Sequence, residues 1–173
     1  DLTELLRKDQ PEKNIKWRQC HTDALNKIKL IMTSKPVLVA PIFDGRELFL
    51  HSDATVTSVA GCLLQKDDHG VERNIGYFSK KLLPRQQKYS VCELECYGIL
   101  TGCLKFHEMI YGYKVVARTD HKSLEFLDSL SNSNSRIARW RVILSTYNLT
   151  TEYRPAAQHA NCDELSRVEM LDD

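Results

Sequence analysis

The stretch that decides the fold is residues 47–81, ELFLHSDATVTSVAGCLLQKDDHGVERNIGYFSKK. Its first part, ELFLHSDA, has the pattern of a strand that leads up to an acidic residue, which predicts a strand that ends near Asp53. SVAGCLLQK predicts a second strand and RNIGYFSKK a third, with the turn-forming run KDDHG between them. Three strands joined by short polar turns indicate an antiparallel meander.

After Ser90 the spacing of apolar residues changes from two to about 3.6, the period of a helix. Ser90 and Glu93 can form a capping box, so we expect a helix from there to near Gly112. A fourth strand is expected over YKVVART (113–119) and a fifth over LTTEYRP (149–155). Helices are expected over 121–130, over 136–147 and from residue 161. The order βββαβααβα predicts an α/β fold with a sheet of mixed direction.

A further helix is expected before this region, from about Arg18 to Thr33, with Ala24, Leu25, Ile28 and Ile31 on one face. Pro36 and Pro41 end it. We therefore assign residues 1–36 to a linker or the end of a preceding domain, 37–168 to the main domain and 169–173 to an acidic tail. Because the chain opens without Met, we expect it to be a piece of a longer protein.

The composition limits the class of protein. Hydrophobic residues make up 42% and charged residues 27% of the chain, as in ordinary globular domains, which excludes a disordered chain. No apolar run approaches the roughly 20 residues of a membrane span, so we expect no membrane partner. Six cysteines without a CxxC pair argue against a disulfide scaffold or a zinc ribbon and indicate a reducing compartment. The net charge of +1 gives no support for nucleic-acid binding.

Four acidic residues stand where the expected strands and helices begin or end: Asp53, Glu95, Asp120 and Asp163. If the first and fourth strands are neighbours, Asp53 and Asp120 lie side by side at the edge where ligands of open α/β sheets gather. Clustered carboxylates repel one another unless a cation compensates them, and Mg²⁺ prefers such oxygen ligands. Spacing alone leaves equally open that these are ordinary acids, favoured at strand ends and helix starts by solvent and helix dipoles.

The residues around these acids carry a resemblance to a known family. Five blocks occur in order: HSDATVTSVAGCLLQ (51–65), NIGYFSKKLLPRQQKYSVCELECYGIL (74–100), ARTDHKSLEFL (117–127), SRIARWRVILSTYNLTTEYRP (135–155) and NCDELSRV (161–168). Together they resemble the ribonuclease H region of gypsy-class long-terminal-repeat retrotransposon polyproteins, from about Trp17 to Val168. The chain departs from that pattern at Ser58 and Ala60, where glycines are usual, at Leu94 in place of a basic residue, and at Ala156 in place of glycine.

The resemblance implies the ribonuclease H-like fold, with three antiparallel strands and then two parallel ones in a five-stranded sheet flanked by helices. It implies hydrolysis of the RNA strand of RNA–DNA hybrids during reverse transcription, with two Mg²⁺ ions for which Mn²⁺ can substitute. The implied catalytic and metal-binding residues are Asp53, Glu95, Asp120 and Asp163, with Glu95 rather than Glu93 as the catalytic glutamate. Residues before about Trp17 would belong to the end of a reverse transcriptase, whose polymerase region would be a partner in the same polyprotein.

Other side chains are candidates for substrate contact. The densest basic cluster precedes the long helix and is the better candidate for the hybrid backbone: Lys80, Lys81, Arg85 and Lys88. Arg136 and Arg139, beside Trp140, could also track phosphates, or could belong to a solvated helix face. His159, four residues before Asp163, could assist the leaving group, although the family's mobile histidine lies further from the last Asp.

Three cysteines and a histidine recur at helical spacing along the expected long helix, which raises the possibility of a zinc site. They are Cys92, Cys96, Cys103 and His107. Four ligands on one straight helix cannot converge on a tetrahedral ion, so we expect buried thiols.

The leading prediction is an active ribonuclease H in an intracellular setting, either a cytoplasmic particle or the nucleus. The alternative is a catalytically inactive connection domain or a host-adopted binding module of the same fold. Such domains lose the carboxylates, and all four remain here. A DNA-directed or integrase-like nuclease usually carries a late Glu, whereas here Glu is second and Asp last.

Overall fold

The computed structural model describes residues 17–33, 38–122 and 135–154. The chain divides into two compact units, residues 1–39 and 40–173. Most of the helix expected over 121–130, and all of the helix expected from residue 161, lie outside the described residues.

Among its described residues, the first unit contains helix α1, which spans Gln19–Thr33 and confirms the helix expected there. Its start is fixed by local side chains: Trp17 Nε1 donates to Thr22 Oγ1 (2.8 Å), and the Arg18 backbone N–H donates to His21 Nδ1 (3.0 Å). Ile28 and Ile31, on the predicted apolar face, are exposed. Over the described ranges, no helix is both long and apolar enough to cross a membrane.

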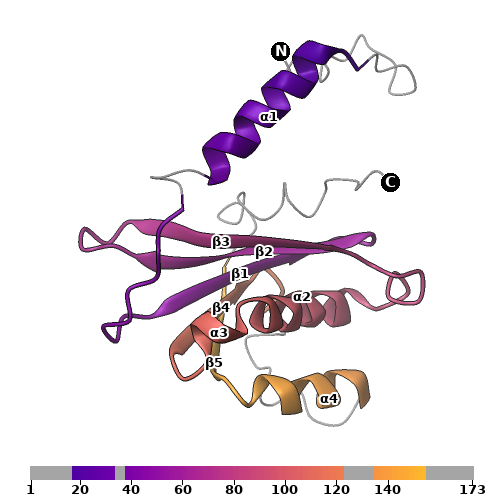
Figure 1. The fold of residues 1–173 in the computed structure, drawn as a ribbon. Coiled ribbons are helices and arrows are strands. Elements are labelled where there is room, and N and C mark those ends of the chain that lie inside the picture. Colours follow the sequence, from indigo (N-terminus) through magenta and orange to yellow (C-terminus); the bar gives the residue numbers. More distant parts are fainter. Residues whose placement is uncertain (1–16, 34–37, 123–134, 155–173) are drawn as a thin grey trace. The chain divides into compact units, whose positions relative to one another are not determined.

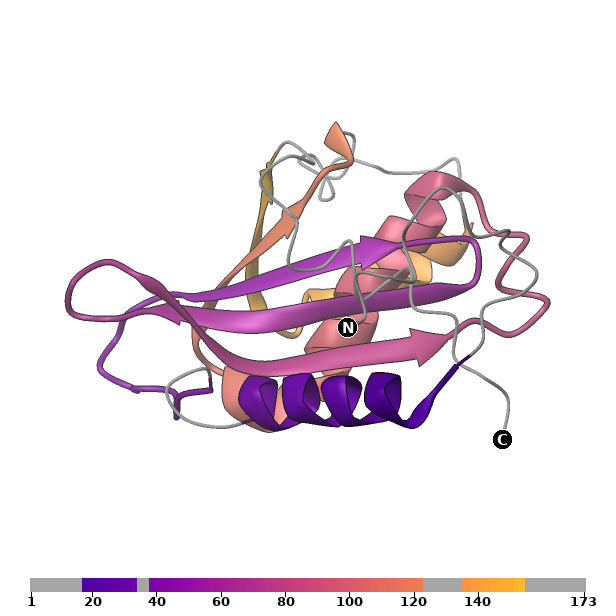
Figure 2. The same ribbon diagram turned by 90° about the horizontal axis from the view of Figure 1, so that it is seen from above.

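The second unit is built on a five-stranded sheet (Figures 1 and 2). Its strands are β1 (Leu48–Ala54), β2 (Ser58–Lys66), β3 (Glu72–Lys81), β4 (Lys114–Thr119) and β5 (Asn148–Tyr153). The order across the sheet is β3-β2-β1-β4-β5; β1, β2 and β3 are antiparallel neighbours, while β4 runs parallel to β1 and to β5. The predicted mixed sheet, with three antiparallel strands and then two parallel ones, is confirmed.

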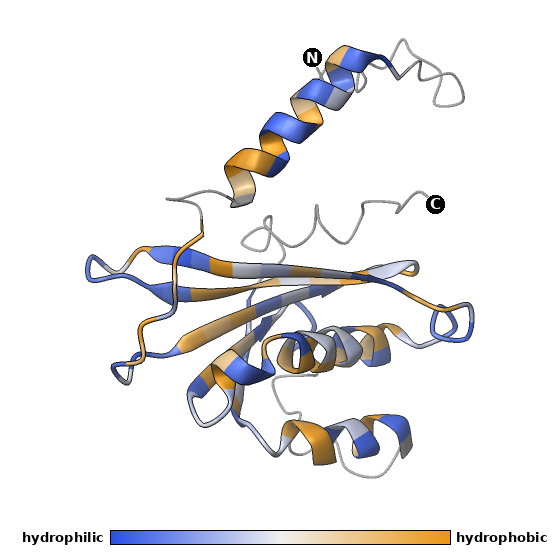
Figure 3. Ribbon diagram, viewed as in Figure 1, coloured by the Kyte–Doolittle hydropathy of each residue, from blue (hydrophilic) through white to orange (hydrophobic). Residues whose placement is uncertain are grey.

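Asp67 shows why the polar run between β2 and β3 forms a turn. Its Oδ1 accepts hydrogen bonds from the backbone N–H groups of His69 and Val71, both at 2.9 Å. Gly70 follows with φ of 77°, a left-handed conformation that glycine adopts without strain. This turn is among the hydrophilic segments in Figure 3, whereas hydrophobic colour marks much of β1 and α2.

Two helices lie on one face of the sheet (Figure 1). Helix α2 (Val91–Lys105) packs on β1 and β2, and α4 (Ser135–Leu144) packs on α2. The capping box predicted for α2 is present: the Ser90 hydroxyl accepts from the Glu93 N–H, and the Glu93 carboxylate accepts from the Ser90 N–H. Most of the residues that α2 buries are apolar or small, with Glu93 and Glu95 as buried exceptions in its first turns.

The expectation that this helix continues to near Gly112 is wrong. Helix α2 ends at Lys105, and a separate short helix, α3, spans His107–Ile110. Between them Phe106 leaves helical geometry (φ −102°, ψ 17°) and buries its ring against Phe78, with ring centroids 6.1 Å apart. The spacing of apolar residues in the sequence does not reveal this break, because both helices turn apolar residues toward the core.

Gly61 in β2, opposite Ser52 in β1, lies in a tightly packed place of the sheet. A Cβ atom added to Gly61 would lie 2.1 Å from the carbonyl oxygen of His51 and 2.6 Å from the Phe78 ring. Since a backbone oxygen cannot rotate away, the strand pair itself would have to move.

We expect Gly61→Ala to lower the free energy of unfolding by about 2–3 kcal/mol, the usual cost of overpacking a core. Urea denaturation followed by circular dichroism measures this. Gly98→Ala in α2 is the control, because its new methyl group would meet only ordinary contacts at 3.4 Å and alanine favours a helix. Equal stability of the two variants would contradict the close approach.

Candidate metal centre

The parallel pairing of β1 and β4 brings the first two acids together. His51 pairs with Arg118 in the register of these strands, so the register continued by two residues sets Asp53 opposite Asp120. Asp53 is the next-to-last residue of β1, and Asp120 directly follows the last residue of β4. Both carboxylates therefore stand at the same end of the sheet, as the sequence predicts.

Glu95 reaches the same point from α2. Gly98, one turn further along the helix, lies beside Ser52 of β1, where a Cβ atom added to it would stand 3.4 Å from the Ser52 side chain. The Thr119 hydroxyl, at the end of β4, donates to Glu95 Oε2 at 3.5 Å. Glu95 is 4% exposed, whereas Asp120 is open to solvent.

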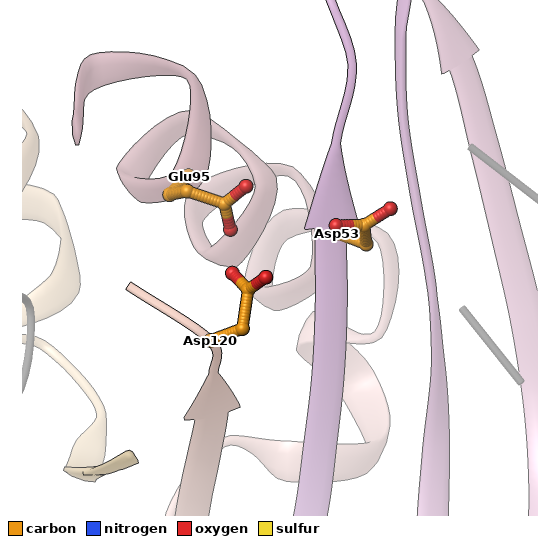
Figure 4. A group of neighbouring side chains, drawn as sticks. All are labelled: Asp53, Glu95 and Asp120. Carbon is orange, nitrogen blue, oxygen red and sulfur yellow. The ribbon is translucent and has the colours of Figure 1, made fainter. Parts of the chain in front are cut away.

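The three carboxylates face one another (Figure 4). One oxygen each from Asp53, Glu95 and Asp120 can be chosen such that all lie within 4.8 Å of one another. This is the only group of three or more potential metal ligands within the ranges 17–33, 38–122 and 135–154. Its donor set is entirely oxygen, the set that a hard divalent cation such as Mg²⁺ prefers, whereas zinc sites in proteins usually include Cys or His.

The pKa of Glu95 also indicates that these three carboxylates would be favoured by a bound cation. Burial, reinforced by the nearby charges of Asp120 and Asp53, raises the pKa of Glu95 to about 8. Hydrogen bonds from the Ala54 backbone and the Thr119 side chain oppose the rise without cancelling it. A divalent cation at this position would favour the ionised form of all three groups. When no cation is bound, the ionised form of Glu95 is therefore disfavoured by burial and by the two neighbouring charges.

Two further predicted site residues, Asp163 and His159, lie outside the described residues. The fourth carboxylate and the auxiliary histidine remain predictions.

The basic cluster before α2 is exposed at all four positions: Lys80, Lys81, Arg85 and Lys88. Lys80 Nζ donates to the Tyr97 hydroxyl (2.9 Å) and lies 5.3 Å from the centroid of that ring. The same hydroxyl accepts from Gln86 Nε2 at 2.9 Å, so the loop is tied to α2 at one point. The other three cations stand on the loop between β3 and α2 or at its entry.

Arg136 and Arg139 on α4 differ in their surroundings. Arg139 is exposed, whereas Arg136 forms an ion pair with the buried carboxylate of Glu93. Trp140 is half-buried between Tyr89 and Tyr97, with ring centroids at 5.7 and 5.4 Å.

The cysteine residues of α2 behave as core side chains. Cys96 and Cys103 are fully buried, and burial raises the pKa of each thiol to about 12. Protonated thiols are poor zinc ligands, since the thiolate is the form that binds metal. The described cysteines are all free thiols: Cys20, Cys62, Cys92, Cys96 and Cys103.

A second polar network was not foreseen from the sequence. Arg118 of β4 donates to Glu72 of β3 (2.6 Å) and to Glu152 of β5 (2.8 Å), and contacts His51 Nε2 of β1 at 3.1 Å. Its guanidinium lies 4.1 Å from the centroid of the Phe49 ring. His51 and Arg118 each precede a clustered carboxylate by two residues, so these side chains lie on the same face of the sheet as Asp53 and Asp120. An arginine within an otherwise apolar strand is the sequence signal, but its acidic partners lie 46 and 34 residues away.

Comparison with known proteins places this geometry in a family. Residues 44–147 match the family described as the RNase H-like domain found in reverse transcriptase. Two related polyproteins of fission yeast (Schizosaccharomyces pombe), those of transposons Tf2-3 and Tf2-4, are each 31% identical to this chain over 174 aligned residues. The match covers 96% of this chain and 12% of each polyprotein, so the chain spans about an eighth of the length of these relatives.

Solved structures share the fold. The foamy viral protease-reverse transcriptase in complex with dsDNA matches 88% of this chain and 33% of its own, with a TM-score of 0.66 and 18% identity. The same viral protein in complex with an RNA/DNA hybrid matches 92% of this chain and 21% of its own, with a TM-score of 0.54 and 18% identity. The resemblance to the ribonuclease H region of retrotransposon polyproteins is thus confirmed, and the chain belongs to the family of RNase H-like domains found in reverse transcriptases.

Proposed function

We propose that this domain hydrolyses the RNA strand of RNA–DNA hybrids during reverse transcription. The observation that carries the proposal is the convergence of Asp53, Glu95 and Asp120, whose carboxylate oxygens lie within 4.8 Å of one another. An inactive connection or binding module has no need of a buried Glu95 that faces two further acids, an arrangement that costs stability when no cation is bound. Their retention therefore supports the enzyme over that alternative.

The four acidic residues would bind the two metal ions. Asp53, beside Asp120 at the end of the sheet and near Glu95 of α2, would contribute to both cation positions, and Asp163 would complete the ligand set as the sequence predicts. The chemistry that two bound Mg²⁺ ions supply is activation of a water molecule and stabilisation of the leaving oxygen in an in-line displacement. Mn²⁺, with the same preference for oxygen ligands, is expected to substitute.

The hybrid would meet the protein through exposed basic side chains. Lys81, Arg85 and Lys88 are exposed on or next to the loop that leads into α2, and Lys80 and Arg139 extend this set. Cations at this place favour the phosphate backbone without selecting a base sequence. Since the net charge is only +1, we expect the domain to depend on a tethered polymerase region for much of its affinity.

The place of the chain in a longer protein supports that partner. The relatives are transposon polyproteins of which this chain matches 12%. We propose that residues 37–168 form the ribonuclease H domain and that the residues before them connect it to the polymerase region. The boundary of the two compact units, between residues 39 and 40, supports this division.

A labelled RNA–DNA hybrid incubated with the protein and resolved on a denaturing gel tests the proposal. We expect cleavage of the RNA strand with Mg²⁺ or Mn²⁺, none with a chelator, and none of labelled double-stranded DNA. Binding of the hybrid without cleavage in either metal would favour the inactive module. Cleavage of DNA would favour a DNA-directed nuclease.

A further inference from the structure

An ion pair joins the first turn of α4 to the first turn of α2. Arg136 Nη1 donates to Glu93 Oε1, while Glu93 Oε2 accepts from the backbone N–H of Ser90 at 2.8 Å. One carboxylate therefore closes the capping box of α2 with one oxygen and binds a second helix with the other. The Glu93 side chain is 8% exposed and that of Arg136 is 39% exposed, so the carboxylate is screened from water on nearly all sides.

Arg136 is held by a second contact as well. Its guanidinium lies 4.2 Å from the centroid of the Tyr89 ring, which packs in turn against Trp140 of α4. A planar guanidinium can present an edge to a carboxylate and a face to an aromatic ring at once, whereas a lysine ammonium cannot match both. The residue is thus fitted to a fixed place between the two helices.

This contact lies next to the metal centre along the chain. Glu95 follows Glu93 by two residues, within the first turns of α2. The first turn of a helix is its least secured part, because its N–H groups have no partners within the helix. Glu95 must also approach Asp53 and Asp120, which repel it. Any loosening of this turn would let Glu95 move away from the other two acids.

We propose that Arg136 is a positioning residue for the metal centre. By neutralising and fixing Glu93, it holds the first turn of α2 so that Glu95 stays within reach of Asp53 and Asp120. Without the guanidinium, a buried and uncompensated carboxylate would stand two residues from Glu95. This inference rests on the proposed function and places the effect of Arg136 inside the protein, in contrast to the phosphate contact that the sequence suggested.

The test compares Arg136→Met with wild type in two titrations of Mg²⁺. One follows the thermal unfolding midpoint of the protein without nucleic acid, and the other follows the rate of hybrid cleavage. We expect the Mg²⁺ concentration at half-effect to rise about tenfold in both, as when a residue that supports metal ligands is lost. The KM for hybrid at saturating Mg²⁺ should stay unchanged. Lys105→Met, which removes an exposed cation at the far end of α2, is the control and should change neither titration.

A double-mutant cycle separates this role from others. In a Glu93→Gln background there is no buried charge to compensate, so Arg136→Met should add little to the shift in the Mg²⁺ titration. Arg136→Lys, which keeps the charge but loses the planar contact, should fall between Arg136→Met and wild type. If Arg136→Met does not fold, this double variant and Arg136→Lys provide the same comparison.

Three outcomes would overturn the positioning role. A raised KM for hybrid with an unchanged Mg²⁺ titration would assign Arg136 to the phosphates. A lower unfolding midpoint with both titrations unchanged would make the ion pair merely structural, and additive effects in the cycle would uncouple Arg136 from Glu93. Failure of the proposed function looks different: wild type would not cleave hybrid, while the metal titration of the unfolding midpoint would still respond to Arg136→Met.

Discussion

Replacing Asp53 with asparagine is expected to abolish cleavage of RNA–DNA hybrid while leaving the fold intact. Asp53 lies within 4.8 Å of both other acids, measured between ligand oxygens, so its loss removes a ligand that we propose both cations share. We expect the rate of cleavage to fall by about a thousandfold or more, which corresponds to roughly 4 kcal/mol of transition-state stabilisation. A single-turnover assay with protein in excess over labelled hybrid measures the chemical step directly.

The same substitution should slightly stabilise the protein when Mg²⁺ is absent. Asp53 is one of the charges that raise the pKa of Glu95, and an amide at this position removes that repulsion. Loss of activity together with an equal or higher unfolding midpoint would separate a catalytic role from a folding defect.

Glu108→Gln is the matched control, because Glu108 is an exposed acid of α3 and has no part in the proposed site. It should retain full activity. Near-normal turnover by Asp53→Asn would exclude the metal centre proposed for these acids. Glu93→Gln would be a poor control, since Glu93 is buried and serves both the capping box and the ion pair with Arg136.

The elements that the sequence predicted well are those set by local chemistry. The hairpin at Asp67 depends on a side chain that binds backbone groups two and four residues away, and the start of α2 depends on Ser90 and Glu93. The juxtaposition of Asp53 and Asp120 was also predictable once β1 and β4 were taken as neighbours, because parallel strands end at the same edge.

What could not be predicted depends on contacts between distant parts of the chain. Helix α2 ends at Lys105 because Phe106 packs against Phe78 of β3, a contact that leaves no trace in the apolar spacing. The pairing of Arg136 with Glu93 joins residues 43 positions apart, so Arg136 looked in the sequence like any exposed helix cation. The burial of Glu95 could not be predicted from the sequence either, because it depends on how helix α2 packs on the sheet.

The burial of Glu95 leads to a prediction about stability and pH. Its pKa is about 8 in the folded protein, against an ordinary value of 4.5 in the unfolded chain. Between these two pH values the folded form keeps a proton that the unfolded form has lost, so the free energy of unfolding should fall as pH rises. The fall attributable to Glu95 can reach about 1.4 kcal/mol per pH unit and should level off above the folded pKa.

Three measurements isolate this contribution from that of other titrating groups. The unfolding midpoint of wild type, Glu95→Gln and Glu108→Gln should be followed from about pH 4 to about pH 9, a range that spans both pKa values, with chelator present. Wild type and Glu108→Gln should lose stability across this range, whereas Glu95→Gln should lose distinctly less. At low pH the advantage of Glu95→Gln over wild type should vanish, because both then carry a neutral side chain.

Adding Mg²⁺ should reverse the trend in wild type and in Glu108→Gln, but not in Glu95→Gln. A cation held by Asp53, Glu95 and Asp120 favours the ionised carboxylates, so stability gained from the metal should grow as pH rises. Glu95→Gln, which lacks one anionic ligand, should gain less from the metal at every pH. If instead wild type and Glu95→Gln showed the same slope with pH and the same response to Mg²⁺, the buried glutamate would not be the charge that strains this site, and the carboxylates would not act together as one cation-binding group.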